Sequence, residues 1–205
     1  MSKSNSVQTG AEMENINSCS PENNAVGDDL LAAAAANGSE AAVEQLYYRY
    51  RRPLYSYLNR MLNHDNMTAD DMFQELWIKV IKNLCNYSPD GKFGAWIFRI
   101  ARNQVLEHFR REKSRAKLGT TTEDGELPDI SKINTEPSGM VGAQELTEKL
   151  QQLLSELPPE QREVFIMRQN NLSFKEIAEI QKCPINTALG RMHNCLKFLR
   201  HKLCQ

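Results

Sequence analysis

The sequence contains no long apolar run. A membrane-spanning helix needs about 18 to 20 consecutive apolar residues, and the longest run of small and apolar residues, Leu30–Ala36, is much shorter. The N-terminus also lacks a basic segment followed by an apolar stretch, the pattern of a secretory signal. We therefore expect no membrane insertion and a cytoplasmic location.

Paired cysteines and enzymatic motifs are missing as well. The five cysteines are an odd number and form no C-x-x-C pair, which argues against a disulfide framework or a zinc knuckle. We find no nucleophile–base pair, no phosphate-cradling glycine loop and no metal-ligand cluster, and the four histidines are dispersed. These absences predict a protein that is not an enzyme and has no cofactor and no small-molecule substrate.

Charge is segregated although the net charge is only −1. Residues 91–118 hold eight Lys/Arg and two acids, a local charge of +6. Residues 182–205 hold five Lys/Arg and no acid, whereas residues 119–160 hold nine acids and two lysines. Polyanion binding depends on where charge lies rather than on its sum. Two separate basic zones indicate two phosphate-contacting surfaces.

The pattern of apolar residues predicts an all-α protein with two small helical domains. Residues 1–27 are polar and expected to be disordered. A first helical domain covers 28–117, a flexible acidic linker 118–142, and a second helical domain 143–205. No strand pattern is present. The predicted helices span residues 28–36, 39–62, 68–84, 94–115, 143–156, 159–169, 173–181 and 186–203.

Local signals refine these helices. Pro53 predicts a kink, or a break near Arg51, because proline removes a backbone donor and clashes with the preceding turn. Thr68 is the expected N-cap of the third helix. Ser173 and Glu176 have the spacing of a capping box.

The last two helices have the pattern of a helix-turn-helix. A compact turn at 182–184 precedes a helix, expected to be capped by Asn186 or Thr187, with one apolar stripe. That stripe holds Ala188, Met192, Cys195, Leu196, Leu199 and Leu203. The opposite arc, with Arg191 at its edge, holds Asn186, Gly190, His193, Asn194, Lys197 and His201. Such an arc can enter a major groove, although a basic amphipathic helix can also be a solvated surface helix.

The helix predicted at 68–84 carries an unusual polar face. Its apolar stripe is expected to hold Met72, Phe73, Leu76, Trp77, Val80, Ile81 and Leu84. The opposite arc places Ile78 among Asp71, Gln74 and Glu75. A lone exposed Ile is common on protein surfaces, but one that is surrounded by carboxylates and an amide also resembles the centre of a protein docking site.

The helix predicted at 94–115 combines cations with nearby rings. Arg99, Asn103, Leu106 and Arg110 align on one face, and Arg111 extends the charge. The preceding segment adds Lys92 and, with the start of the helix, the aromatic residues Tyr87, Phe93 and Trp96. Rings for stacking and cations for the backbone are what unpaired bases need, whereas the plain alternative is a solvated basic face.

Three strings together resemble a known family. They are ADDMFQELWIKVIKNL, GKFGAWIFRIARNQVLEHFRRE, and the segment from Leu157 to Leu203 that begins LPPEQREVFIMRQ. The chain resembles extracytoplasmic-function sigma factors of the sigma-70 family in conserved regions two and four, over about residues 40–115 and 143–203. Two departures are TALGR, where the family commonly has T-V-x-S-R, and Asn194 in place of a common arginine.

The resemblance implies residue roles. Asp71, Gln74 and Glu75, with Ile78 beside them, would bind core RNA polymerase. The loop 86–93 with Tyr87, Lys92, Phe93, Trp96, Arg99, Asn103, Arg110 and Arg111 would read and open the −10 element. The residues that would read the −35 element are Asn186, Thr187, Gly190, Arg191, His193, Asn194 and Lys197.

Two other functions stay open from the sequence. A stand-alone helix-turn-helix regulator would leave the 68–84 and 94–115 helices unused. A sigma-like interaction protein that binds an anti-sigma factor would not need basic residues on both reading helices, and here they are present. The expected partners are therefore core RNA polymerase and promoter DNA, with an anti-sigma factor as a further candidate.

Overall fold

The computed structural model describes residues 27–119 and 143–203, with side chains for 27–116 and 148–203. The expected disordered tail and most of the expected linker lie outside these residues. The described part contains no strand, which confirms the all-α prediction. Its α-helices are α1 (Asp28–Ala36), α2 (Glu40–Met61), α3 (Asn66–Asn83), α4 (Phe93–Gly119), α5 (Ala143–Ser155), α6 (Pro159–Gln169), α7 (Phe174–Gln181) and α8 (Ile185–Leu203).

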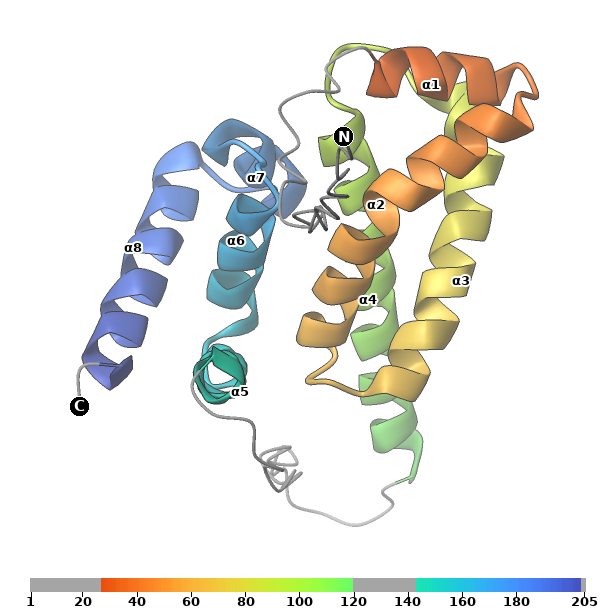
Figure 1. Cartoon of the computed structure of the whole chain (residues 1–205). Coiled ribbons are helices and arrows are strands. Elements are labelled where there is room, and N and C mark those ends of the chain that lie inside the picture. Colours follow the sequence, from red (N-terminus) through yellow and green to blue (C-terminus); the bar gives the residue numbers. More distant parts are fainter. Residues whose placement is uncertain (1–26, 120–142, 204–205) are drawn as a thin grey trace, which may run out of the picture.

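The helices form two groups that lie side by side (Figure 1). In the N-terminal helices, α2 packs against α3 and α4, and α1 lies across one end of α2. In the C-terminal helices, α6 packs against both α7 and α8, and α5 packs against α8. A short 3-10 helix, Leu84–Asn86, ends α3 and leads into the loop before α4.

Side-chain caps set the start of three helices. The Ser39 hydroxyl accepts from the amide of Ala42 at the start of α2. Ser173 and Glu176 form the predicted capping box of α7. The prediction for α3 was wrong, because Asp65 is the N-cap and accepts from the amide of Thr68 at 3.2 Å. Thr68 is inside the first turn, and its hydroxyl donates back to Asp65 at 2.6 Å.

Helix α2 continues through Pro53, so of the two predicted outcomes, a kink or a break near Arg51, the break is wrong. Buried residues lie on both sides of the proline: Leu46 comes before it, and Leu54, Tyr57 and Leu58 follow it. Packing of α2 against α3 and α4, with buried residues on both sides of Pro53, offsets the loss of the donor that proline removes.

The predicted apolar stripes are mostly correct. Met72, Leu76, Trp77 and Val80 of α3 are buried, as are Ala188, Cys195 and Leu199 of α8. The exceptions are Ile81, Leu196 and Leu203, which belong to the predicted apolar faces but are exposed. Periodicity places the centre of a buried face well, but the width of that face depends on which neighbours cover it.

The two groups of helices share one contiguous hydrophobic core. Buried side chains of α2, α3 and α4 connect without a gap to Val164, Ile166 and Met167 of α6 and to Ile177 of α7. Helix α6 contacts α2, and α7 contacts α4. The reading surfaces proposed from the sequence are therefore held in one closed arrangement, by which we mean this packing of α6 and α7 on α2 and α4.

Candidate polymerase and nucleic-acid interfaces

The polar face of α3 lies open on the surface. Asp71, Gln74, Glu75 and Ile78 are all exposed, and the side chain of Ile78 is 52% accessible. Their spacing of three and four residues puts them on one side of the helix. The amide of Gln104 in α4 donates to Glu75 at 3.1 Å and so limits the freedom of that carboxylate. The structure thus brings the four predicted residues together as an acidic patch with an apolar centre.

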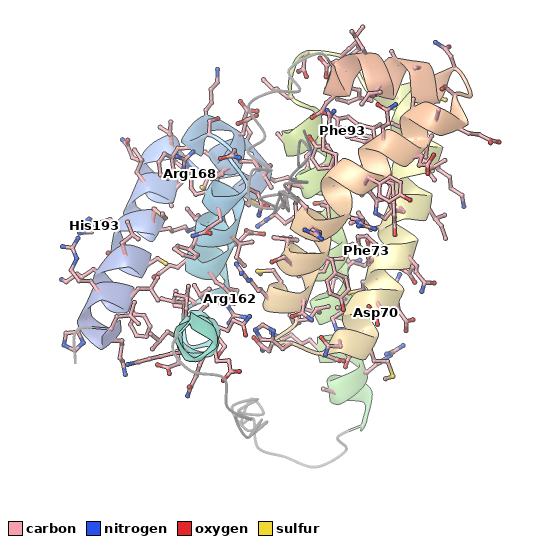
Figure 2. All side chains as sticks on the ribbon, viewed as in Figure 1. Asp70, Phe73, Phe93, Arg162, Arg168 and His193 are labelled. Carbon is pink, nitrogen blue, oxygen red and sulfur yellow. The ribbon has the colours of Figure 1, made fainter. Side chains whose placement is uncertain are left out.

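We call the loop between the 3-10 helix and α4, residues 87–92, the reading loop. Its Tyr87 ring contacts those of Phe93 and Trp96, with centroids 5.3 and 5.1 Å away. The ring of Tyr50 in α2 packs on Phe93 from the other side, at 5.4 Å. Figure 2 shows Phe93 inside the N-terminal helices, and only 1% of it is exposed.

This burial corrects the predicted role of Phe93. A ring with no accessible face cannot stack on a base. Phe93 instead packs against the rings of Tyr87 and Trp96 and supports them. Tyr87 and Trp96 are half-buried and present their outer parts to solvent. Tyr50 is half-buried as well, so Phe93 is the one ring of these four without an accessible part.

A cavity of about 230 Å³ opens beside these two rings. The reading loop and α4 form one wall, which includes Lys92 and Arg99. Helix α7 forms the other wall, with Glu176, Glu179 and Ile180. The ammonium of Lys92 lies 3.9 Å from a carboxylate oxygen of Glu179. The first wall also includes Asp90, and in the closed arrangement its two cations face the acidic side chains of α7.

The outer face of α4 matches the predicted basic surface. Arg99, Asn103 and Arg110 are exposed, and Leu106 between them is 49% accessible. Arg111 donates to Glu107 one turn earlier at 2.5 Å. Exposed ion pairs of this kind contribute little to stability, so a phosphate can replace Glu107 as the partner of Arg111 at small cost.

Helices α7 and α8 form the predicted helix-turn-helix. Lys182 ends α7 in the left-handed conformation, with φ of 53°, and α8 begins at Ile185. Asn186 and Thr187 lie in the first turn of α8 rather than at its cap, because the carbonyl of Pro184 accepts the first backbone hydrogen bonds. Both side chains are exposed and remain part of the outward arc.

The rest of that arc is also open to solvent. Gly190, His193, Asn194 and Lys197 are exposed, and Figure 2 shows His193 pointing away from the other helices. A Cβ added at Gly190 would meet no atom within 4 Å. The fold therefore does not require this glycine, which costs helix stability, and a small surface at position 190 is available to an external partner.

Arg191 differs from the other predicted −35 residues. It is half-buried, and its guanidinium donates to the side-chain oxygen of Gln181 at 2.6 Å and to the sulfur of Cys183 at 3.6 Å. These bonds tie α8 to the end of α7 and the turn. Arg191 therefore helps to fix the angle between the two helices.

Sequence reasoning missed a buried polar network between the two groups of helices. The carboxylate of Glu163, 3% exposed, accepts from the hydroxyl of Tyr57 at 2.8 Å and from Arg102 at 3.0 Å. Gln181 donates to the same carboxylate at 2.6 Å. Burial, followed by the nearby charge of Glu163, raises the pKa of Tyr57 well above its usual value, so its phenol stays a donor.

Arg162 forms a second bridge beside this network, between α5, α6 and the end of α2 (Figure 2). Its guanidinium donates to the carbonyl of Arg60 at 3.0 Å and to the side chain of Asn63 at 2.5 Å. It also donates to the carbonyls of Ser155 and Leu157. The only signal in the sequence was an adjacent Arg-Glu pair in front of the apolar run VFIM.

The described residues contain no candidate metal site and no candidate membrane-spanning helix. No group of three or more His, Cys, Asp or Glu side chains among them could hold a metal ion. None of their helices is long and apolar enough to cross a bilayer.

Comparisons with known proteins agree with this geometry. The family model "Sigma-70 region 2" matches residues 46–115, and "Sigma-70, region 4" matches residues 147–199. The ECF RNA polymerase sigma factor SigW of Bacillus subtilis is 29% identical over 171 residues, which are 81% of this chain and 91% of that protein. The ECF RNA polymerase sigma-E factor of Escherichia coli K12 is 25% identical over 181 residues, 86% of this chain and 94% of that protein.

Solved structures share the fold. The sigma factor RpoE of Bartonella quintana, in complex with the anti-sigma factor NepR, superposes with a TM-score of 0.62 and 19% identity and covers 78% of this chain and 95% of that one. CnrH in complex with the cytosolic domain of CnrY gives a TM-score of 0.61 and 23% identity, covering 84% and 94%.

These matches identify the class: the chain belongs to the sigma-70 family of RNA polymerase sigma factors. Regions two and four follow each other with a short connection, and relatives that match over most of their length carry the extracytoplasmic-function name. The chain is therefore an extracytoplasmic-function sigma factor that recognises promoters.

Proposed function

We propose that this sigma factor joins core RNA polymerase through the acidic patch of α3 and directs it to promoters through two DNA-reading surfaces. It acts as a non-enzymatic initiation subunit and works in the cytoplasm. The observation that carries this proposal is the placement of the basic faces of α4 and α8 and the acidic face of α3 on three separate exposed surfaces. A stand-alone regulator that binds duplex DNA would need only a basic surface.

The reading loop and α4 are suited to an opened −10 element. Tyr87 and Trp96 offer ring faces, while Lys92 and Arg99 supply positive charge at the same cavity. Extruding a base from the stack costs a few kcal/mol, and stacking on a ring returns about 1–3 kcal/mol per base. Arg110 and Arg111 continue the basic face along α4, where they can follow the strand backbone.

Helix α8 is suited to a duplex −35 element. A major groove admits an α-helix, and Asn186, Asn194 and Lys197 on the exposed arc are of the side-chain types that read base edges and phosphates. Helix α7 crosses behind it, as the first helix of such a motif does when it crosses the DNA backbone. Arg191 maintains the angle between them.

Both elements cannot be bound in the closed arrangement. They lie about 25 base pairs apart, which is roughly 85 Å at 3.4 Å per base pair. In the closed arrangement α7 and α4 line the same cavity. The proposed function therefore requires the C-terminal helices to separate from the N-terminal helices, and this separation frees Lys92 from Glu179.

An anti-sigma factor is a further proposed partner. The structure of the Bartonella quintana neighbour contains one, named NepR. In this chain, a protein that binds the closed arrangement would keep the cavity beside Tyr87 covered by α7. Such a partner would act as an inhibitor of the function proposed above.

The deciding experiment is transcription in vitro from a genomic library, with purified chain and sigma-free core polymerase. Mapping of the transcript starts should show one shared upstream sequence at a fixed spacing. A control without the chain should show no such starts. If the chain neither joins the core enzyme nor produces defined starts, while it binds duplex DNA alone, the stand-alone regulator is the correct function.

A further inference from the structure

The first turn of α1 holds two adjacent acidic residues, Asp28 and Asp29, with different partners. Asp28 accepts from the phenol of Tyr50 at 2.5 Å and from the guanidinium of Arg49, both in α2. Asp29 turns the other way, toward the reading loop. Helix α1 lies outside the residues that the family models match.

The carboxylate of Asp29 bonds both ends of the reading loop. Its Oδ1 accepts from the phenol of Tyr87 at 2.5 Å, and its Oδ2 accepts from the amide of Gly91 at 2.6 Å. These partners are 58 and 62 residues away along the chain. One side chain therefore clamps the segment that supplies a wall of the cavity.

The loop has few backbone hydrogen bonds of its own. Among the described residues, no backbone amide of residues 88–91 donates to another backbone group. Gly91 has φ of +75°, a conformation that glycine adopts without strain. A charged acceptor gives stronger hydrogen bonds than a neutral one, so Asp29 contributes strongly to the path between Tyr87 and Gly91, beside the ring contacts of Tyr87 and its hydrogen bond with the backbone of Asp90.

The clamp also sets the orientation of the Tyr87 ring. Burial, together with the hydrogen bond to Asp29, raises the pKa of Tyr87, and the phenol stays a donor to the carboxylate. With its hydroxyl held there, the ring is fixed against Phe93 and Trp96.

We propose that Asp29 is a positioning residue for promoter opening: it holds Tyr87 and Gly91 so that the wall formed by the reading loop is already in place when the C-terminal helices have separated and an unpaired base arrives. This inference rests on the proposed function, in which the reading loop receives a base of the opened strand. Asp29 does not touch the DNA. It lowers the cost of binding because the loop does not have to become ordered at that moment.

Asp28 provides a matched control. Both carboxylates lie in the first turn of α1, where each interacts favourably with the helix dipole. Asp28→Asn and Asp29→Asn remove the same charge one residue apart, but only the second change releases the reading loop. Asp29→Glu keeps the charge and tests whether a carboxylate one methylene longer restores the bonds.

The test uses holoenzyme reconstituted from each variant and core polymerase. The probe is a single-stranded oligonucleotide that carries the non-template −10 sequence of a start site mapped with the unaltered chain. For Asp29→Asn we expect weaker oligonucleotide binding by about tenfold or more, roughly the loss of one stacked base. Affinity for core polymerase and for a −35 duplex should stay unchanged. Asp28→Asn should bind the oligonucleotide as the unaltered chain does, and Asp29→Glu should recover part of the loss.

Two results would overturn the inference. One is unaltered oligonucleotide binding by Asp29→Asn. The other is an equal loss for Asp28→Asn, which would mean that α1 acts only through its general stability. If the unaltered holoenzyme itself does not bind the oligonucleotide, the result contradicts the proposed −10 role of the reading loop. An effect of Asp29→Asn alone concerns only the role of Asp29.

Discussion

The phenol of Tyr57 in α2 donates a 2.8 Å hydrogen bond to the carboxylate of Glu163 in α6, across 106 residues of sequence. Both side chains are buried, and the same carboxylate also accepts from Arg102 and Gln181. The contact between the two groups of helices therefore includes a buried charge with three donors. Such a charge is costly to leave without partners, so each donor contributes to holding the closed arrangement.

Tyr57→Phe should lower the free energy of unfolding by about 1.5–3 kcal/mol, the usual range for a hydrogen bond to a charged group. The substitution removes only the hydroxyl and leaves the ring contact with Phe98. Urea denaturation followed by circular dichroism measures the change.

Tyr55→Phe is the matched control for this prediction. Its hydroxyl is on the surface, and its pKa is raised mainly by a hydrogen bond with Asp70. We expect a change of less than about 0.5 kcal/mol for this surface substitution. Equal effects of the two substitutions would show that the buried network does not contribute to stability.

Separation of the two groups of helices is a direct consequence of the proposed function. Spin labels at the exposed positions Glu44 in α2 and Lys175 in α7 would report it by pulsed electron resonance. We expect a single short distance in the free chain. The distance should increase by tens of Å when core polymerase and promoter DNA are present, because the two elements lie roughly 85 Å apart.

The same distance can be measured in the Glu163→Gln variant. The neutral side chain leaves Arg102 with a weaker partner in the interface. The free variant should then show a second, longer distance without polymerase. A distance that stays short in the promoter complex would contradict the requirement for opening.

Much of the architecture could be predicted from local sequence signals. The bounds of α1 and α6 match the predicted ranges, since Asn37-Gly38 follows the first helix and Pro158-Pro159 opens the other. The exposed faces of α3, α4 and α8 also agree with their periodicity. These features depend on residues within a turn or two of each other.

The errors and omissions arise where distant residues meet. Aromatic character at 87, 93 and 96 did not reveal which ring is buried, because Tyr50 of α2 covers Phe93. Asp29 had no visible role, since its partners come from a loop about 60 residues later. The network around Glu163 has no periodic signal, because it forms only when α6 packs on α2 and α4.

Charge reversal on α3 tests the polymerase interface. Asp71→Lys together with Glu75→Lys should reduce affinity for core polymerase by at least about a hundredfold, because truncating or opposing buried interface charges costs 2–5 kcal/mol or more. Circular dichroism should show an unchanged helical content, since both side chains are exposed. Co-purification with tagged core enzyme measures the binding.

The control is Glu44→Lys, which makes the same reversal at one exposed position of α2 that the α3 variant makes at each of two positions. It should leave polymerase binding intact. If the α3 double variant still co-purifies with the core enzyme while the salt dependence of binding is unchanged, the acidic patch is not the docking surface.

The face of α8 that enters the groove can be identified from salt dependence. Lys197 is exposed on the outward arc, whereas Lys202 in the same helix lies 3.8 Å from Glu156 and over the ring of Phe198. Each phosphate contact adds about 0.9 to the slope of log affinity against log salt concentration. Lys197→Ala in the holoenzyme should therefore reduce that slope on a duplex promoter by about one contact, and Lys202→Ala should leave it unchanged.

Because both substitutions remove one positive charge from α8, any difference between them reports geometry and not net charge. Equal slopes for the two variants would mean that the outward arc of α8 does not contact the DNA backbone at Lys197.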